Sequence, residues 1–449
     1  MAPIHIITTQ ILVLLLYIFF SVSRAYTTLS NETLLALPHP GNDFDIRNGA
    51  LLAPILQPRV PGTPGSTAVL NHLANFFKTT LPEWKLEFQN STSTTPATGN
   101  QQIPFVNLIA TRDPPWTEPG EVGRLALVAH YDSKLTPAGF IGATDSAAPC
   151  AMLLHAARSV DRALTTKWTG MAASGAGAGD GFGDIDEHQG LQIIFLDGEE
   201  AFASWTDTDS IYGARALAEA WEQTPHPPLS TYRTALSAIS LFLLLDLLGA
   251  RDPHVPSYFQ TTHWAYRHMA GLETRLRGLR SFKSSPNHPS KRRRNTASGN
   301  KSSRQSKAKA KPKPKPKPNA RADKILPSRE ERLFLPEAGK TTDRFQGGMV
   351  LDDHVPFMAR GVDVLHLIPT PFPRVWHELD DDGEHLDLDT VEDWALLTTA
   401  FVAEWMDLEG FFETTAAEGG VRRGGEEERE EGEGEGMERR WAVTSKTEL

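Results

Sequence analysis

The sequence predicts an α/β fold with a mostly parallel sheet and helices on both faces. Two observations lead to this prediction. Short apolar runs of strand length alternate along the chain with longer segments whose apolar residues recur at helical spacing. Acidic residues and histidines directly follow several of the apolar runs, as expected where parallel strands end at a common edge. The 449 residues suffice for one large α/β domain or two ordinary ones.

The predicted strands are short and rich in aliphatic residues. The run Leu-Ala-Leu-Val-Ala-His, which ends at His130, is almost wholly apolar, as is typical of a strand buried on both faces. On the same grounds we expect strands at residues 84–88, 105–111, 124–130, 191–196, 238–245 and 362–368.

The predicted helices rest on apolar spacing and on turn residues that end them. Val69, Leu73 and Phe77 recur at helical spacing, and Pro82 follows as a stop signal. We expect helices at residues 66–79, 146–164, 209–221, 263–279 and 388–408, and a wrapping, Pro-rich segment at residues 26–66.

Low-complexity segments interrupt and follow one predicted domain, which covers residues 26–412. Residues 168–189 are rich in Gly, Ala and Asp, and residues 281–327 contain a Lys-Pro repeat, so both are predicted insertions. The formal net charge is −11 but unevenly spread: residues 291–317 carry twelve Lys or Arg and no acid, and residues 418–438 carry nine Glu. Such runs cannot form a core, so residues 413–449 are predicted to be a disordered acidic tail.

The N-terminus resembles a targeting segment. Residues 4–22 are mostly apolar, and Ser23-Arg24-Ala25 is a plausible cleavage site. We therefore predict that residues 1–25 are a signal peptide or a membrane anchor, and that the protein enters the secretory pathway, either secreted or anchored in the ER or Golgi membrane. The one cysteine, Cys150, excludes an internal disulfide.

Three residues are candidate metal ligands. Asp145, Glu200 and His377 each come just after an apolar run or a Gly/Pro turn, where a sheet delivers side chains to one edge. Two carboxylates and one imidazole suit zinc and leave a position open for substrate. Open coordination favours catalysis over a structural role. For Asp145 alone, a helix N-cap is the competing interpretation.

Further carboxylates suggest proton chemistry. Glu199 and Glu200 follow a buried strand in Asp-Gly-Glu-Glu, so one can hold metal while the other, with a raised pKa, handles protons. The alternative is a solvated acidic loop. Asp246 ends the apolar run Leu-Phe-Leu-Leu-Leu, where a carboxylate is costly unless it is paired or metal-bound. A buried ion pair is its alternative role.

Histidines and aromatic residues complete the candidate site. His130 with Asp132 ends a strand, either as a metal-site element or as a satisfied polar residue. His366, inside an apolar strand, needs a hydrogen-bond partner, which Asp352 or Asp353 can supply. Three aromatic residues lie close in sequence to the proposed ligands and form either pocket walls or core: Trp205, Phe372 and Trp376.

Seven ordered motifs give these residues a context. They are His-Tyr-Asp-Ser-Lys, Gly-Ala-Thr-Asp-Ser-Ala-Ala-Pro-Cys, Asp-Gly-Glu-Glu-Ala-Phe, Asp-Ser-Ile-Tyr-Gly-Ala-Arg, Leu-Leu-Asp-Leu-Leu-Gly-Ala, Asp-Asp-His-Val-Pro-Phe and Val-Leu-His-Leu-Ile-Pro-Thr-Pro-Phe-Pro-Arg-Val-Trp-His. Over residues 45–410, apart from the insertions, the chain resembles the animal-type glutaminyl-peptide cyclotransferases, which are relatives of the zinc aminopeptidases. The resemblance implies a three-layer α/β/α fold around a central mixed, mostly parallel sheet.

The resemblance also implies residue roles. One zinc per chain would be held by Asp145, Glu200 and His377, with Glu199 as the acid/base and Asp246 as a second catalytic carboxylate. The remaining implied roles are a hydrogen-bond network at Asp352 and His366 and a substrate pocket at Trp205, Phe372 and Trp376. The implied reaction converts an N-terminal Gln of a peptide to pyroglutamate with release of ammonia. We expect a monomer.

One departure from the family concerns cysteine. Family members often have a cysteine just before the position of His130, bridged to the one that matches Cys150. This chain has Ala129 there. The missing bridge should cost roughly 2–3 kcal/mol of stability. The 281–327 insertion lies at a pocket-rim connection of the family and bears on substrate preference.

Two other functions compete with the cyclase. A zinc aminopeptidase would hold two metals among His130, Asp145, Glu200, Asp246 and His377, with Glu199 activating water. The basic residues 291–317 could bind nucleic acid or another anionic polymer through counterion release. They lack interleaved aromatic residues and a nucleic-acid-binding fold, so we expect no specific nucleic-acid partner.

Overall fold

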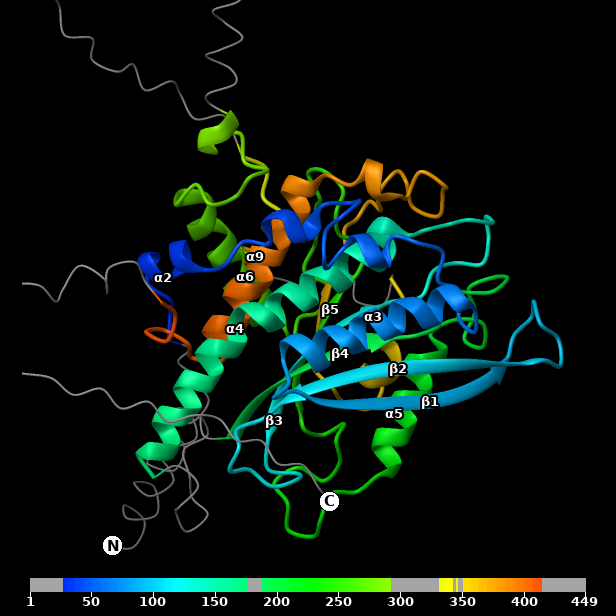
Figure 1. Ribbon diagram of the computed structural model, residues 1–449, viewed down its shortest axis with the longest axis horizontal. Coiled ribbons are helices and arrows are strands. Elements are labelled where there is room, and N and C mark those ends of the chain that lie inside the picture. The colour runs from blue at the N-terminus through cyan, green and yellow to red at the C-terminus, as the bar shows by residue number, and fades with distance from the viewer. Residues whose placement is uncertain (1–26, 176–187, 292–330, 342–344, 346–349, 414–449) are drawn as a thin grey trace, which may run out of the picture. The chain divides into compact units, whose positions relative to one another are not determined.

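A six-stranded mixed sheet forms the centre of the protein, and helices cover both of its faces (Figure 1). The computed structural model describes residues 27–175, 188–291, 331–341, 345 and 350–413. The predictions for residues 1–25, for the Lys-Pro repeat and for the acidic tail after residue 413 therefore lie outside the described residues. The three-layer α/β/α prediction is confirmed.

The strand order places a topological switch at the middle of the sheet. The order is β1-β2-β4-β3-β5-β6, in which β4, β3, β5 and β6 run parallel while β2 is antiparallel to β1 and β4. The bounds are β1 Lys85–Thr94, β2 Gln102–Arg112, β3 Gly123–His130, β4 Gln189–Leu196, β5 Ile239–Leu245 and β6 Val364–Leu367. Because β4 and β5 flank β3 on opposite sides, the chain leaves a crevice beyond the carboxyl ends of these strands, where α/β folds bind ligands.

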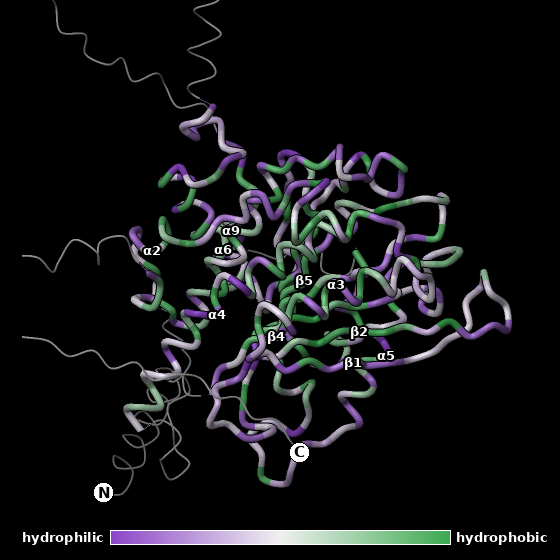
Figure 2. The backbone as a smooth tube through the Cα atoms, viewed as in Figure 1, coloured by the Kyte–Doolittle hydropathy of each residue, from purple (hydrophilic) through white to green (hydrophobic). Residues whose placement is uncertain are grey.

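The side chains of each central strand point alternately to the two faces of the sheet, which divides the hydrophobic core into two clusters. On β3, Leu125, Leu127 and Ala129 face one hydrophobic cluster, whereas Ala126 and Val128 face the other. Successive side chains of a strand point to opposite faces of the sheet. Because helices cover both faces here, both sets of side chains are apolar and the strands appear in the sequence as continuous apolar runs. The hydropathy colouring shows these central strands as the most apolar part of the backbone (Figure 2).

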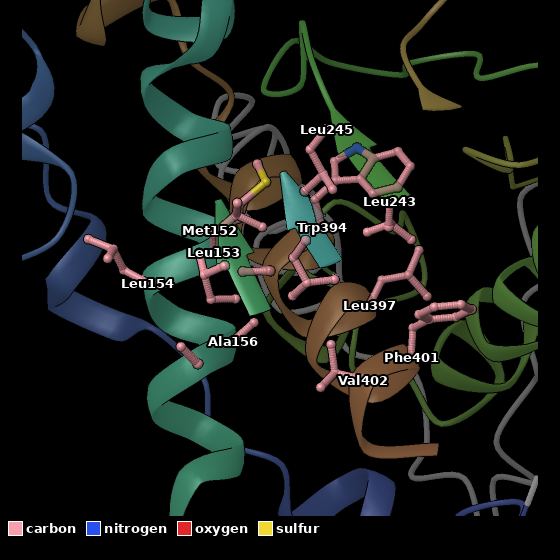
Figure 3. Packing of buried hydrophobic residues seen from close by; sticks show 14 of the residues in the cluster. Met152, Leu153, Leu154, Ala156, Leu243, Leu245, Trp394, Leu397, Phe401 and Val402 are labelled. Carbon is pink, nitrogen blue, oxygen red and sulfur yellow. The ribbon is translucent and has the colours of Figure 1, made fainter. Parts of the chain in front are cut away.

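Four long helices cover the larger cluster. They are α3 Pro64–Thr80, α4 Ala148–Ala173, α6 His263–Gly278 and α9 Leu388–Trp405. Figure 3 shows Met152 and Leu153 of α4 packed with Trp394 and Leu397 of α9, beside Leu243 and Leu245 of β5. Each such buried side chain contributes about 1.5–3 kcal/mol relative to exposure. This packing holds α4, whose N-terminal end lies at the site, firmly against the sheet.

The opposite face is covered by shorter elements. Helix α5 spans Tyr212–Gln223, and its Leu217 and Trp221 pack with Phe357 of α8 Val355–Met358 against the second cluster. The remaining short elements are α2 Asn31–Ala36, the 3-10 turns Gly41–Phe44, Ala53–Ile55 and Gly383–His385, and a π-helical turn Ala143–Ala147.

Two predicted insertions begin later than expected. Helix α4 continues to Ala173, and Trp168 is buried in it with the Arg112 guanidinium 5.1 Å from its ring, so residues 168–173 are helix and not insertion. Residues 281–291 also belong to the domain, because Phe282 is buried against Phe334, with ring centroids 5.6 Å apart. Both errors arose because polar and Gly/Ala-rich sequence hid a single anchoring aromatic residue.

Within the described part of the chain, none of the helices combines the length and the apolar character that crossing a bilayer requires.

Candidate active site

A pocket of about 460 Å³ lies beyond the carboxyl ends of β3, β4 and β5. It brings together eight of the ten residues to which the family resemblance assigns a role in the site. The lining residues among them are Asp145, Glu199, Glu200, Trp205, Asp246, Phe372, Trp376 and His377. The other two, Asp352 and His366, lie buried behind the pocket.

The three proposed metal ligands converge in this pocket. Nε2 of His377 lies 3.6 Å from a carboxylate oxygen of Asp145 and 3.6 Å from one of Glu200. One ligand atom from each residue lies within 4.8 Å of the other two. Ligands about 2.0 Å from a tetrahedral zinc are about 3.3 Å apart, so a small adjustment suffices to hold the ion.

The chemistry of these ligand groups also fits a cation. Oε1 of Glu200 is buried and has no hydrogen-bond partner among the described residues. Burial, and then the nearby Glu200 carboxylate, raise the pKa of Asp145 well above its usual range. Two buried carboxylates this close are unfavourable unless a positive charge lies between them. The residues therefore fit a metal ion.

Asp145 is not a helix cap. It lies in the π-helical turn before α4, and the α4 N-terminus has no side-chain cap. Its side chain is buried and turned toward the pocket.

The carboxylates after β4 belong to a buried turn, not to a solvated loop. Gly198 has φ +73°, and a Cβ there would meet the Phe105 ring at 2.3 Å, so the chain can turn sharply only with glycine. The turn lets both Glu199 and Glu200 line the pocket. The Asp132 carboxylate accepts hydrogen bonds from both their backbone N–H groups, at 3.0 and 3.2 Å.

Glu199 has the electrostatic character of an acid/base. Burial raises its pKa well above the usual range; His130 opposes this shift, and the Glu200 carboxylate adds to it. A carboxyl group with a raised pKa can both accept and deliver a proton near neutral pH.

His130 links the carboxylates on the other side of the pocket. Its Nε2 lies 3.0 Å from Asp145 and 3.4 Å from Asp246, and its Nδ1 lies 3.3 Å from Asp132. Although burial lowers the pKa of His130, the three carboxylates raise it well above its usual value. Burial raises the pKa of Asp246, but the hydrogen bond and positive charge of His130, together with the Ser146 hydroxyl and His366, outweigh it and leave that pKa lowered. Asp246 is thus a buried, ionised group paired with His130.

Behind Asp246, the structure brings Asp352 and His366 into contact. Nε2 of His366 lies 2.7 Å from a carboxylate oxygen of Asp352. Burial lowers the pKa of His366 to about 4 and raises the pKa of Asp352 well above its usual range. The His366 imidazole is therefore neutral near pH 7, and its short contact with Asp352 provides a rigid polar backing for the Asp246 side of the site.

The three proposed pocket aromatics are at the rim and not in the core. Trp205 is 38% exposed and Trp376 is 40% exposed. The Phe372 and Trp376 rings meet edge to face, with centroids 4.8 Å apart. Large exposed rings around a polar pocket are typical of a binding site.

Several residues that line the pocket were not predicted from the sequence. Lys134, in the quoted His-Tyr-Asp-Ser-Lys motif, places its ammonium 3.4 Å from Glu200, and the motif's position after a strand was the available signal. The pocket also has an apolar side formed by Leu247, Val350, Leu351 and Ile368, whose aliphatic sequence carries no functional signal.

Known proteins share this fold and sequence. Residues 107–287 and 328–402, more than half of the chain, match peptidase family M28. The chain is 34% identical to the glutaminyl-peptide cyclotransferase of Bothrops jararaca, over 80% of each chain. It is 35% identical to that of Bos taurus, over 80% of this chain and 81% of the relative. The crystal structure of Macrostomum lignano glutaminyl cyclase superimposes with a TM-score of 0.62 at 26% identity, covering 86% of this chain and 97% of the other.

The fold and the carboxylate-rich pocket at its switch point define the class: this is an α/β protein of the M28 peptidase type. Within that class, the chain belongs to the glutaminyl-peptide cyclotransferase family.

Proposed function

We propose that the protein is a zinc-dependent glutaminyl-peptide cyclotransferase that converts the N-terminal Gln of peptides and proteins to pyroglutamate. The observation that carries the proposal is the meeting of three groups in one pocket: a three-ligand metal cluster, the raised-pKa carboxyl of Glu199 and a wall of aromatic rings. The family membership supports the same reaction.

Asp145, Glu200 and His377 would hold one zinc ion. When bound there, zinc supplies Lewis-acid polarisation of the substrate's γ-carboxamide carbonyl. Lys134 lies against Glu200 and offsets part of the negative charge of the site.

The reaction forms one new C–N bond and moves one proton from the attacking nitrogen to the leaving nitrogen. The substrate's α-amine nitrogen attacks the γ-carboxamide carbon, the new C–N bond closes the five-membered ring, and the original C–N bond breaks to release ammonia. Glu199 accepts the proton that the α-amine loses and delivers it to the departing nitrogen. Because the attack is intramolecular, the protein's task is to orient and polarise the groups.

Asp246 and the aromatic rings would orient the Gln side chain. Asp246, ionised and held by His130, can accept a hydrogen bond from the carboxamide NH₂ and stabilise the positive charge that develops on the leaving nitrogen. Trp205, Phe372 and Trp376 would pack on the short side chain and exclude water that could attack in place of the amine.

An aminopeptidase remains the competing activity, because a second group of possible ligands adjoins the first. His130, Asp145 and Asp246 bring ligand atoms within 4.8 Å of one another, and Asp145 belongs to both groups. A two-metal peptidase would use both groups and a water nucleophile. Metal analysis separates the two: one tightly bound zinc per chain supports the cyclase, and two support the peptidase.

The activity test is direct. Purified protein is incubated with a Gln-initiated peptide, and ammonia release is measured together with loss of the same mass from the peptide. The matched control is the same peptide with an acetylated α-amine, which lacks the nucleophile. We expect product only from the free amine, loss of activity with a zinc chelator and recovery on adding zinc. Release of free Gln without cyclisation would contradict the proposal.

The location and the assembly state also remain proposals. The apolar residues 4–22 and the site at Ser23-Arg24-Ala25 support entry into the secretory pathway, as a secreted or an ER- or Golgi-anchored protein. We further propose that the protein is a monomer. N-terminal sequencing of protein from the culture medium and from membranes distinguishes cleavage after Ala25 from retention as an anchor.

A further inference from the structure

The backbone of the loop that carries Asp145 is hydrogen-bonded to residues that are distant in the sequence. Residues 141–145 connect the pocket to α4, and Gly142 has φ +65° there. A Cβ at Gly142 would lie 2.1 Å from the Asp145 carbonyl oxygen, so the loop folds tightly on itself. Its backbone polar groups consequently need partners from elsewhere, because buried N–H and C=O groups without partners are costly.

Arg59 supplies the donors for the carbonyl groups of this loop. It is fully buried, and its guanidinium donates to the carbonyl oxygens of Gly142 at 3.0 Å and Asp145 at 3.2 Å, and also to that of Ile141. The same guanidinium donates to the Tyr131 carbonyl at 2.5 Å, just after β3. One planar group thus ties the Asp145 loop to the end of the central strand, with no carboxylate among the hydrogen-bond acceptors that its guanidinium has in the described residues.

Asp381 supplies the acceptors for the same loop. Its carboxylate accepts from the Thr144 backbone N–H at 2.8 Å and from the Thr144 hydroxyl at 3.1 Å. Its backbone carbonyl accepts from the Ala143 N–H at 3.0 Å. Asp381 is buried and follows His377 by only four residues, so the segment that carries one proposed ligand grips the loop that carries another.

We propose that Arg59 and Asp381 are positioning residues that clamp the Asp145 loop from both sides and thereby set the separation of Asp145 from His377. The inference rests on the proposed zinc role of these two ligands. Neither Arg59 nor Asp381 lines the pocket, so they act through the backbone around Asp145. Loss of groups that orient metal ligands typically costs 10–100-fold in metal affinity.

The hydrogen bonds that Arg59 makes to the backbone carbonyl groups require an arginine at this position. A guanidinium presents five N–H donors in a fixed plane, whereas a lysine ammonium presents three donors from one point. Arg59→Lys therefore keeps the buried charge but cannot reach both Tyr131 and the far end of the loop. We expect it to bind zinc 10–100-fold more weakly in a chelator competition with the full-length protein.

The matched control for this variant is Arg277→Lys. Arg277 is also buried, pairs with Glu273 within α6 at 2.7 Å and packs on Phe282 and Phe334, away from the pocket. We expect Arg277→Lys to lower the melting temperature without changing the zinc affinity.

Asp381 is tested in the same way. Asp381→Asn keeps one acceptor oxygen but replaces the other with a donor, and we expect weaker zinc binding. Asp393→Asn is its control, because the buried Asp393 carboxylate also accepts two backbone N–H groups, from Lys283 and Ser284, and none of these three residues lines the pocket. If Arg59→Lys does not fold, the Asp381 pair decides the proposal.

Hydrogen–deuterium exchange of residues 141–147 gives a readout that does not depend on zinc. We expect faster exchange there in Arg59→Lys and Asp381→Asn, and no change in the two controls. Exchange and zinc affinity like those of the wild type in both clamp variants would overturn the proposal, even if their melting temperatures fall. If the wild type binds no zinc, the proposed function fails, and the exchange result still decides whether the clamp exists.

Discussion

The indole of Trp376 stacks on the imidazole of His377, with ring centroids 4.0 Å apart and planes inclined by 24°. Adjacent side chains usually diverge, but His377 has φ +61°, which turns its ring back over its neighbour. A side chain of the pocket wall and a proposed metal ligand are therefore in direct contact, so a change at Trp376 is expected to alter the position of the His377 ring.

Replacement of Trp376 should affect substrate binding and the geometry of His377 together. Trp376→Ala removes a pocket ring and the stack, each worth about 0.5–1.5 kcal/mol, so we expect KM for a Gln peptide to rise about tenfold or more. Trp376→Phe retains a ring over the imidazole and should lose much less. Steady-state kinetics at saturating zinc measure the difference. Equal KM values for the two variants would contradict the stacking argument.

Removal of the Glu199 carboxylate should abolish most turnover. Glu199→Gln keeps the shape of the side chain but cannot accept the amine proton, so kcat should fall by at least about 100-fold. Because Glu199 is not a proposed ligand, the zinc content should stay at the wild-type level. Glu219→Gln, at an exposed position of α5, is the control. Near-normal kcat in Glu199→Gln with zinc bound would rule out its acid/base role.

The positions of Glu200 and Asp246 could be predicted because strand ends meet at one edge. Glu200 and Asp246 each follow a continuous apolar run, and parallel strands bring such positions together whatever the details of packing. His377 lies in a loop after β6, where no periodicity points to it, so its prediction depended on the Pro-rich turn before it and on the motif that contains it.

What the sequence could not predict depends on contacts between distant backbone groups or on single aromatic anchors. Arg59 is one arginine in a Pro-rich stretch, and its acceptors are carbonyl oxygens, which every residue has. Helix α4 runs past Leu164 because Trp168 is buried beneath Arg112, although its polar neighbours obscure the helical spacing. Tertiary contacts of this kind override local pattern.

A designed disulfide should restore the bridge that the chain lacks. Ala129 and Cys150 are both fully buried in the core cluster between the sheet and α4, and the Cys150 thiol donates to the carbonyl of His130, the next residue, at 3.1 Å. Ala129→Cys should therefore form a disulfide with Cys150 and raise the free energy of unfolding by about 2–3 kcal/mol.

Urea unfolding with and without a reductant measures this gain. Ala129→Ser is the control, since it has a similar volume and cannot form the bridge. Free thiols in the folded variant after oxidation, or equal stability in both redox states, would contradict the prediction.

Buried His155 should make the protein less stable in mild acid. Its Nε2 donates to the Pro38 carbonyl at 3.1 Å, and its buried Nδ1 has no hydrogen-bond partner in the described residues. Burial, and then the Arg158 cation, lower the pKa of His155 to about 4. The unfolded chain, with a pKa near 6.5, thus takes up the proton first. The contribution of the neutral, buried His155 to the free energy of unfolding is therefore full above about pH 6.5 and is lost as the pH falls toward 4.

His155→Gln tests the predicted loss of stability at low pH, because glutamine can donate a hydrogen bond to the Pro38 carbonyl without titrating. Other buried acids also change stability over this range, so the informative quantity is the difference in unfolding free energy between variant and wild type at each pH. We expect the wild type to be the more stable protein at pH 7.5, and its advantage to shrink by on the order of 2 kcal/mol by pH 4.5. A difference that stays constant from pH 7.5 to 4.5 would mean that His155 is protonated as easily in the folded protein as in the unfolded chain.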